Sequence, residues 1–459
     1  MVKEQFVVGS IPTAKEAYGV SARIAFPSIV EMTSLSMMQM VSTAMVGSLG
    51  PAAVAAVGLV SQPRMIFMAL FFALNVGVTA VISRRRGEND RAGARLCLRQ
   101  AVLIAIGISI VMAMLAVALA HPMILFAGAE EDTVDLATSY FRITSMVLPA
   151  NAITMTISAA QRGVGNTRVT MVVNMTANII NLLLHYLLIS GNFGFPALGV
   201  DGAALSVAIT GVIGMFLAIG SILRKDAYLK ISVLDSWRPH LEMIKSIAKI
   251  GGNSIIEQMF LRIGFFAFAI IVARLGTEAF AAHQIALQLM NLSFTFADGI
   301  AVATTALVGR YLGAKRPDLS IMYGKIGQRM SLGISVFLVS FTFFGRFWFP
   351  TLFVSDPVAD WHIIEITASL LVVLAIIQPI QTSQLVMAGC LRGAGDTRFV
   401  AITMLLSVAL ARPLLSLFLM FVFDLGILGA WYAMIVDQLM RLVLLYWRFA
   451  KGKWTEIRV

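Results

Sequence analysis

The chain has 459 residues, of which 59% are hydrophobic and 13% charged. Soluble domains carry about a quarter of charged residues, so the composition excludes an ordinary soluble protein, and two cysteines are too few for a disulfide framework. The net charge of +11 would suit nucleic-acid binding, but the basic residues gather in short loops between apolar stretches. That placement is typical of a membrane protein with basic cytoplasmic loops, and we expect no nucleic-acid partner.

Apolar stretches long enough to cross about 30 Å of hydrocarbon recur along the whole chain. We predict an all-α polytopic membrane protein, with the lipid bilayer as its surroundings. Twelve transmembrane helices are expected near residues 17–49, 55–83, 96–120, 133–159, 169–190, 198–222, 246–275, 279–308, 323–347, 361–388, 399–422 and 426–449. Pro27 and Pro379 fall inside expected helices and favour bends there.

The charges of the loops predict the orientation. When the N-terminus is placed in the cytoplasm, basic loops such as 84–86 lie inside and acidic residues such as Glu131 and Asp135 lie outside. Arg274 and Arg346 are exceptions. An even number of helices returns the C-terminus to the same side. We therefore expect a multi-pass protein of the cell membrane with both termini in the cytoplasm.

The sequence repeats itself. Glu31 and Gly50 recur as Glu257 and Gly276, each 226 residues later (31 to 257 and 50 to 276). The segment 162–168 recurs at 392–398, an offset of 230. We predict two pseudo-symmetric six-helix lobes, at residues 1–222 and 246–459, joined by a cytoplasmic linker at 223–245. Two parallel halves with ionisable groups inside apolar helices are typical of a transporter that works by alternating access.

Glu31 and Glu257 are the strongest candidates for coupling. Each lies several turns inside an apolar helix, where a carboxylate is costly unless it is protonated or paired. Such a group can hold a proton or a Na⁺ ion, and a structural carboxylate within a polar network is the alternative. Asp298 either pairs with Arg262 or joins Glu257 at a cation site, and the first half has Phe72 and Ser36 at the corresponding positions.

Uncharged polar residues mark further helices. His283, Gln284 and Gln288 lie on the eighth helix, and Gln378, Gln381 and Gln384 form a row on the tenth. Amides in lipid bind a ligand or join neighbouring helices, and helix contacts are the commoner role. On the fifth helix, spacings of four, three and four residues predict a single polar stripe facing a hydrated cavity or another helix; it consists of Asn174, Asn178, Asn181 and His185.

Two charged features are expected to be structural. Asp437 and Arg441 form an i, i+4 pair on the last helix. The two loops with the pattern Arg-Gly-x-Gly-x-Thr-Arg do not follow a strand, so they are not phosphate-binding loops. We interpret them as turns whose arginines anchor the cytoplasmic side.

The chain resembles the multidrug and toxic compound extrusion (MATE) family over nearly its whole length. The matching segments are Ala44–Gly50, Gln161–Arg168, Ala281–Leu287, Leu307–Ala314 and Leu391–Arg398. The resemblance implies two lobes that form a V around a central cavity and a transporter rather than an enzyme. It also implies export of cationic or amphipathic organic compounds in exchange for H⁺ or Na⁺, without an organic cofactor, by a monomer. The family's helix 7 glutamate corresponds to Glu257 and its helix 5 asparagine to Asn181.

Two departures from the family pattern concern the first lobe. Ser42 and His185 stand where many bacterial members have aspartates, and the tenth helix offers only glutamines where others have an acid. The resemblance therefore implies coupling through Glu257, with Asp298, and with Glu31 compensating in the first lobe. Because imidazole exchanges protons near neutral pH, His185 favours protons over Na⁺.

Two other functions compete with drug export. A flippase for lipid-linked oligosaccharides, from the same superfamily, needs a positively charged cavity for pyrophosphate. A polytopic membrane enzyme needs clustered acids, histidines or cysteines at a membrane face, and the five histidines are scattered without ligand spacing.

Overall fold

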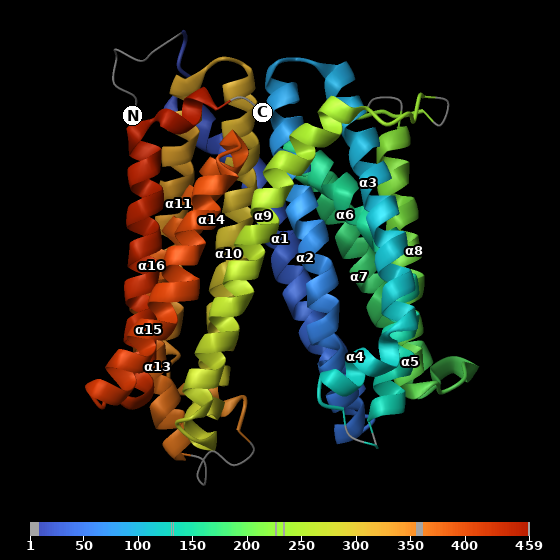
Figure 1. Cartoon of the computed structure of the whole chain (residues 1–459), viewed down its shortest axis with the longest axis vertical. Helices are drawn as coiled ribbons and strands as arrows, with labels where there is room; N and C mark the ends of the chain where they lie inside the picture. Colours follow the sequence, from blue (N-terminus) through green and yellow to red (C-terminus); the bar gives the residue numbers. More distant parts are fainter. Residues whose placement is uncertain are drawn as a thin grey trace. The chain divides into compact units, whose positions relative to one another are not determined.

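The structure is a computed structural model that describes residues 9–129, 131, 133–224, 227–232, 235–354 and 361–457. Throughout these residues the regular structure is helical (Figure 1). Eleven helices of the described part are long and apolar enough to cross a membrane, and a bent pair of shorter helices supplies a twelfth span. The predicted all-α polytopic architecture is confirmed.

The spans follow the expected order along the chain. They are α1 (Ala14–Gly47), α2 (Pro51–Gly87), α3 (Arg91–Ala118), the pair α5 (Val134–Met146) and α6 (Leu148–Gly163), α7 (Thr167–Ser190), α8 (Gly199–Leu223), α9 (Leu241–Ala273), α10 (Thr277–Gly313), α11 (Pro317–Phe344), α13 (Trp361–Ala394), the run 397–422 that begins with α14 (Thr397–Met404), and α16 (Gly426–Lys451). Two short helices, α4 (Ala120–Phe126) and α12 (Trp348–Thr351), lie between spans.

The fourth span departs from the expected single helix. It breaks at Val147, and its two parts, α5 and α6, meet at an angle of 50°. Pro149 lies in the first turn of α6, where its missing N–H and fixed φ suit the start of a new helix. At Pro27 and Pro379, where bends were expected, the chain does not divide into two helices. Instead, α1 and α13 each continue through their proline.

The eleventh span has irregular geometry. Between α14 and α15 (Arg412–Leu417), residues Leu405–Ala411 are π-helical, and a second π-helical stretch, Phe418–Val422, follows α15. The backbone of α9 comes so close to this span that a Cβ on Gly264 would meet the carbonyl oxygen of Val408. π-Helical turns are rare and costly, so the tight contact with α9 helps to hold this one.

The packing of the chain forms two compact units. The N-terminal unit comprises Val30–Gly252, and the C-terminal unit comprises Met1–Ile29 with Asn253–Val459. Both boundaries fall inside helices, so α1 and α9 each contribute residues to both units. The two lobes expected at 1–222 and 246–459, joined by a linker at 223–245, remain a prediction.

The internal repeat appears again in the contacts within each unit. Thr79 on α2 donates to the carbonyl oxygen of Ala159 on α6 at 3.1 Å, and Thr305 on α10 donates to that of Gly389 on α13 at 2.9 Å. One turn further, a Cβ on Gly163 would lie 3.1 Å from the carbonyl oxygen of Thr79, and a Cβ on Gly393 would collide with that of Thr305. Glycine therefore allows equivalent helices to approach closely in both units, and the approach is closer in the C-terminal unit.

Candidate functional site

Each unit contains one buried ion pair between a repeated glutamate and a repeated arginine. In the N-terminal unit, Arg162 Nη2 at the end of α6 lies 2.5 Å from Glu31 Oε1 on α1. In the C-terminal unit, Arg392 Nη2 at the end of α13 donates to Glu257 Oε1 on α9. The glutamates are only 3% and 1% exposed. The sequence placed these arginines at turns as anchors, but their guanidinium groups point back to the carboxylates.

A matching turn follows each arginine. Gly165 and Gly395 have φ angles of +83° and +87°, which glycine adopts without a steric penalty. Each N–H bonds to the arginine carbonyl oxygen three positions back, at 2.9 Å in the first turn and 3.0 Å in the second. This turn ends α6 and α13 and leaves each arginine in the last helical turn, with its side chain free to reach α1 or α9.

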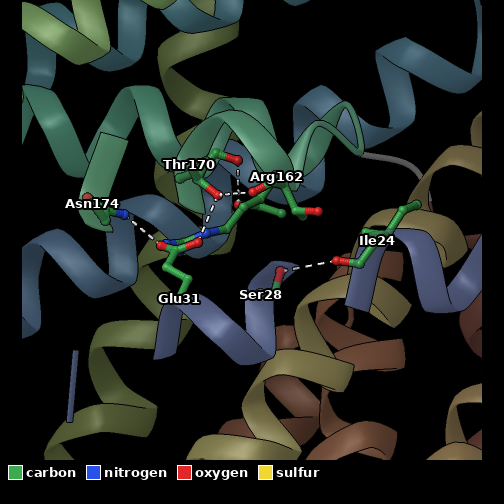
Figure 2. A network of polar contacts seen from close by, with 9 residues as sticks. Ile24, Ser28, Glu31, Arg162, Thr170 and Asn174 are labelled. Carbon is green, nitrogen blue, oxygen red and sulfur yellow. Dashed lines mark hydrogen bonds and ion pairs between the residues drawn. The ribbon is translucent and has the colours of Figure 1, made fainter. Parts of the chain in front are cut away.

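The two carboxylates differ in how completely they are bonded. Thr170 Oγ1 on α7 donates to Glu31 Oε2 at 2.8 Å, and Asn174 Nδ2 donates to Glu31 Oε1 at 2.6 Å. Figure 2 shows Arg162, Thr170 and Asn174 all turned toward the Glu31 carboxylate. Both oxygens of Glu31 are thus bonded, and the charge is neutralised by one arginine.

The C-terminal unit lacks these extra donors. At the offset of 230 residues that relates the two turns, Thr170 and Asn174 correspond to Val400 and Met404, whose side chains donate no hydrogen bond. Glu257 Oε2 is accordingly buried without a hydrogen-bond partner among the described residues. A buried oxygen of a carboxylate rarely stays unbonded, so Glu257 retains an acceptor for a proton or a small cation.

Asp298 on α10 belongs to the same site. It interacts electrostatically with Arg392, and its side chain is half-buried. The sequence left open whether Asp298 pairs with Arg262 or joins Glu257. The electrostatic interaction with Arg392 brings Asp298 toward the Glu257 site, and both alternatives stay predictions; Arg262 lies on an exposed part of α9.

The polar stripe of α7 makes contacts with neighbouring helices. Asn174 binds Glu31 as described, and Asn181 Nδ2 lies 3.5 Å from Thr210 Oγ1 on α8. The buried His185 has Nδ1 at 2.9 Å from the carbonyl oxygen of Asn181 and Nε2 at 2.9 Å from Ser42 Oγ on α1. Because a carbonyl only accepts, Nδ1 carries the proton, so Nε2 accepts from Ser42 when the ring is neutral. Asn178 Nδ2 is buried without a partner among the described residues.

The residues that replace the family's first-lobe acids are thus bonded to each other. Ser42 and His185 join α1 to α7 within the N-terminal unit. This contact has no negative charge, unlike a pair of aspartates. Sequence comparison with the family found both positions, and the structure adds that they interact.

The glutamines of the C-terminal unit divide into buried and exposed groups. Gln378 Nε2 donates to Ser293 Oγ at 2.9 Å and to Thr342 Oγ1 at 2.7 Å, so it joins α13 to α10 and α11. Gln381 is also fully buried on α13. In contrast, Gln284 and Gln288 are exposed and lie one turn apart on α10.

His283 lies in an aromatic environment rather than beside other polar residues. It is 1% exposed, and the rings of Phe268, Phe280 and Trp431 have centroids 5.5, 6.2 and 5.8 Å from the imidazole centroid. Its Nδ1 has no hydrogen-bond partner in the described part of the chain. The neighbouring rings fix its orientation and separate it from the exposed Gln284.

A further buried ion cluster contains Asp437 and Arg441, the pair expected on the last helix, together with Arg412. Arg441 Nη2 binds Asp437 Oδ2 at 3.2 Å, as the spacing predicted, and Arg412 on α15 donates from Nε to the same oxygen at 2.9 Å. All three side chains are at most 2% exposed. The cluster ties α15 to α16 beside the irregular eleventh span.

Comparison with known proteins follows the same division into halves. The family model MatE matches this chain twice, over residues 27–187 and 254–418. The probable multidrug resistance protein NorM of Thermotoga maritima is 30% identical over 446 residues, which cover 95% of this chain and 92% of that protein. The uncharacterized transporter YisQ of Bacillus subtilis is 28% identical and covers 94% of each chain.

Solved structures share the fold over almost the whole chain at low sequence identity. An outward-facing multidrug resistance MATE family transporter superposes with a TM-score of 0.88 at 20% identity, covering 99% of both chains. A transporter of the MOP superfamily from Pyrococcus furiosus, described as having a binding pocket of reverse polarity, gives a TM-score of 0.88 at 20% identity and covers 96% of this chain and 97% of that one.

Proposed function

Because the chain belongs to the MATE family of membrane transporters, which are not enzymes, we propose that it exports cationic or amphipathic organic compounds in exchange for H⁺ or Na⁺. Relatives named as multidrug resistance proteins support export of varied small molecules. The coupling ion is then a second substrate, and no organic cofactor is required. The chain works as a multi-pass membrane protein in this account.

The observation that carries the proposal is the unbonded oxygen of Glu257. The carboxylate is buried, and Arg392 takes only Oε1. A proton on Oε2, or Na⁺ beside it, supplies the missing interaction. Neither ion competes with a hydroxyl or amide donor there, because Val400 and Met404 hold the positions equivalent to Thr170 and Asn174.

Binding of the ion changes the balance around Arg392. With Glu257 charged, Arg392 has one strong anionic partner in direct contact and a second, Asp298, within electrostatic range. A cation bound at Glu257 cancels the negative charge of its carboxylate, and this weakens the attraction between Glu257 and Arg392. The attraction between Arg392 and Asp298 is then the stronger of the two. The site thus has two states that differ in the partner of Arg392, which is the property that ion coupling requires.

Glu31 has a different role in this proposal. Its carboxylate is bonded by Arg162, Thr170 and Asn174, so a further ion would have to displace one of these donors. A fully bonded buried charge stabilises a fixed arrangement of helices. We assign Glu31 to holding α1 against α6 and α7, and Glu257 to exchange of the ion.

Exposed polar residues are the best candidates for contact with the exported compound. Gln284 and Gln288 present two amides on one face of α10, and Arg262 is exposed on α9. Asn178 keeps an unbonded amide nitrogen on α7. Gln381 and His283 are buried and reach a ligand only if the helices around them separate.

The distribution of charge supports the orientation proposed from the loops. Arg84, Arg85 and Arg86 fall in the last turn of α2, and Arg448 and Lys451 fall in the last turn of α16. The basic ends of spans prefer the cytoplasm. We propose the cell membrane as the location, both termini inside, and a monomer as the working form.

Transport by purified protein in sealed liposomes tests this function. A fluorescent lipophilic cation is loaded, a gradient of H⁺ or of Na⁺ is imposed, and the rate of efflux is followed. Gradient-driven efflux supports the antiporter and identifies its ion. If no organic cation moves and a lipid-linked oligosaccharide crosses the bilayer instead, the flippase of the same superfamily replaces the proposal.

A further inference from the structure

A small pocket lies inside the N-terminal unit, away from Glu31. Helices α2, α5, α6 and α8 line it, and its polar residues are Arg64, Thr144, Ser145 and Asn151. Apolar side chains that include Phe67 and Phe141 complete the wall. The wall contains no carboxylate.

Arg64 is an unusual residue for an apolar helix. It lies within the candidate membrane span Ala52–Gly87, about 18 Å along α2 from Ala52 at 1.5 Å per residue, and its side chain is half-buried. It forms no hydrogen bond or ion pair with any described residue, and the titratable group that it influences is the phenol of Tyr140, which is uncharged at neutral pH. An arginine inside a membrane span is expensive unless an anion or water accompanies it.

Other donors face the same space without an acceptor. Ser145 is 3% exposed and lines the pocket, yet its hydroxyl makes no hydrogen bond within the described residues. The side-chain amide of Asn151 is likewise unbonded there, whereas the Thr144 hydroxyl already donates to the carbonyl oxygen of Tyr140 at 2.8 Å. Donors that line a pocket without a protein acceptor leave their hydrogen bonds to whatever occupies the pocket. One cation and two donors therefore face the same space, since Arg64, Ser145 and Asn151 all line it.

We propose that this pocket binds a small monovalent anion, with chloride as the species that solutions supply, held by Arg64, Ser145 and Asn151. The space is close in size to about one water molecule, so an organic anion of drug size does not fit. The bound anion neutralises Arg64 inside the span and holds the bend between α5 and α6 against α2. This inference does not depend on the proposed function.

Anion-dependent stability of the purified protein tests the proposal. Gluconate is replaced stepwise by chloride while the sodium concentration is kept constant, so that any effect of Na⁺ at Glu257 is the same in every sample. Thermal unfolding is followed by tryptophan fluorescence. Chloride is expected to raise the unfolding temperature of the wild type with a saturating dependence. In Arg64→Gln the half-saturating concentration rises at least tenfold, and in Arg64→Lys it is intermediate.

The matched control is Arg142→Gln, which removes an exposed arginine from α5 outside the pocket and leaves the chloride response unchanged. Bromide in a crystal should give an anomalous peak beside Arg64. Equal responses of wild type and Arg64→Gln, or equal stabilisation by gluconate, would overturn the proposal and leave a pocket that holds only water. If Arg64→Gln does not fold, Ser145→Ala replaces it, and an unchanged half-saturating concentration in that variant and in Arg64→Lys has the same meaning.

Discussion

Arg392 binds Glu257 through one carboxylate oxygen, and the other is buried without a hydrogen-bond partner in the described part of the chain. The repeated pair, Glu31 with Arg162, has both oxygens occupied. Since the pairs occupy equivalent positions, the difference comes from two neighbouring side chains, Val400 and Met404, in place of a threonine and an asparagine. From this asymmetry we propose exchange of an ion in one half and a structural tie in the other.

Restoring the missing donor should weaken coupling. Val400→Thr places a hydroxyl where Thr170 stands in the other half, and the two side chains have the same shape. We expect the hydroxyl to donate to Glu257 Oε2 and compete with the ion, so that the ion concentration for half-maximal transport rises about tenfold, equivalent to about 1.4 kcal/mol. Val400→Ala, which adds no donor, serves as the control. An unchanged ion dependence in Val400→Thr would show that Oε2 does not bind the ion.

Removing the charge of Glu31 should cost stability. Glu31→Gln replaces the charged partner of Arg162 by a neutral acceptor, and because Arg162 is 21% exposed we expect a loss of about 1.5–3 kcal/mol, as for a hydrogen bond to a charged group. The expected result is a clear drop in unfolding temperature, with ion-driven transport per folded molecule retained. Glu257→Gln should lose less stability, because its carboxylate has fewer bonds. The assignment of roles fails if Glu31→Gln unfolds like the wild type and abolishes ion dependence.

The contact between Ser42 and His185 should contribute modestly to packing. Ser42→Ala removes the group bonded to Nε2 of a buried imidazole, for which we expect a loss of about 1 kcal/mol. The neighbouring Thr43→Val is the control, since Thr43 Oγ1 bonds only within its own helix, to the carbonyl oxygen of Gln39 at 2.9 Å. Thermal unfolding of the two variants compares them. Equal stability of Ser42→Ala and Thr43→Val would exclude a stabilising bond at His185.

A side chain at Gly393 should disturb the ion pair between Arg392 and Glu257. Its Cβ would collide with the backbone of Thr305 on α10, so Gly393→Ala pushes α13 away and displaces Arg392 next to it. We expect a loss of folded yield and weaker gradient-driven transport. Gly333 on α11 has open space around it, and Gly333→Ala should leave transport unchanged and stability equal or up to about 1 kcal/mol higher, because alanine favours the helix. Wild-type behaviour of Gly393→Ala would show that α10 and α13 separate easily.

Much of this fold follows from sequence pattern, because apolar length and repeated residues determine spans and symmetry. Glu31 and Glu257 stand out for the same reason, since a charge within an apolar span is conspicuous. The partners Arg162 and Arg392 were missed because their sequence pattern suggested turns on the cytoplasmic side, where arginine is ordinary, whereas the structure places them in the last turns of α6 and α13. Their offset of 230 residues, close to the 226 of the glutamates, was the available signal. The break at Val147 was missed because Pro149 follows a run that remains apolar.

The roles of uncharged polar residues are harder to predict. The spacing of Asn174, Asn181 and His185 predicts a shared face, but only three-dimensional packing supplies Glu31, Ser42 and Thr210 as their partners. The same limit applies to Arg64, whose neighbours come from three other helices.

The most direct test of the account compares gradient-driven efflux with compound-for-compound exchange in liposomes that contain Glu257→Gln. Exchange of labelled for unlabelled compound needs no ion gradient, whereas net efflux against a concentration difference does. We predict that Glu257→Gln retains exchange and loses the response to both H⁺ and Na⁺ gradients, while Glu31→Gln retains both activities per folded molecule. Gradient-driven efflux by Glu257→Gln at the rate of the wild type would contradict the account.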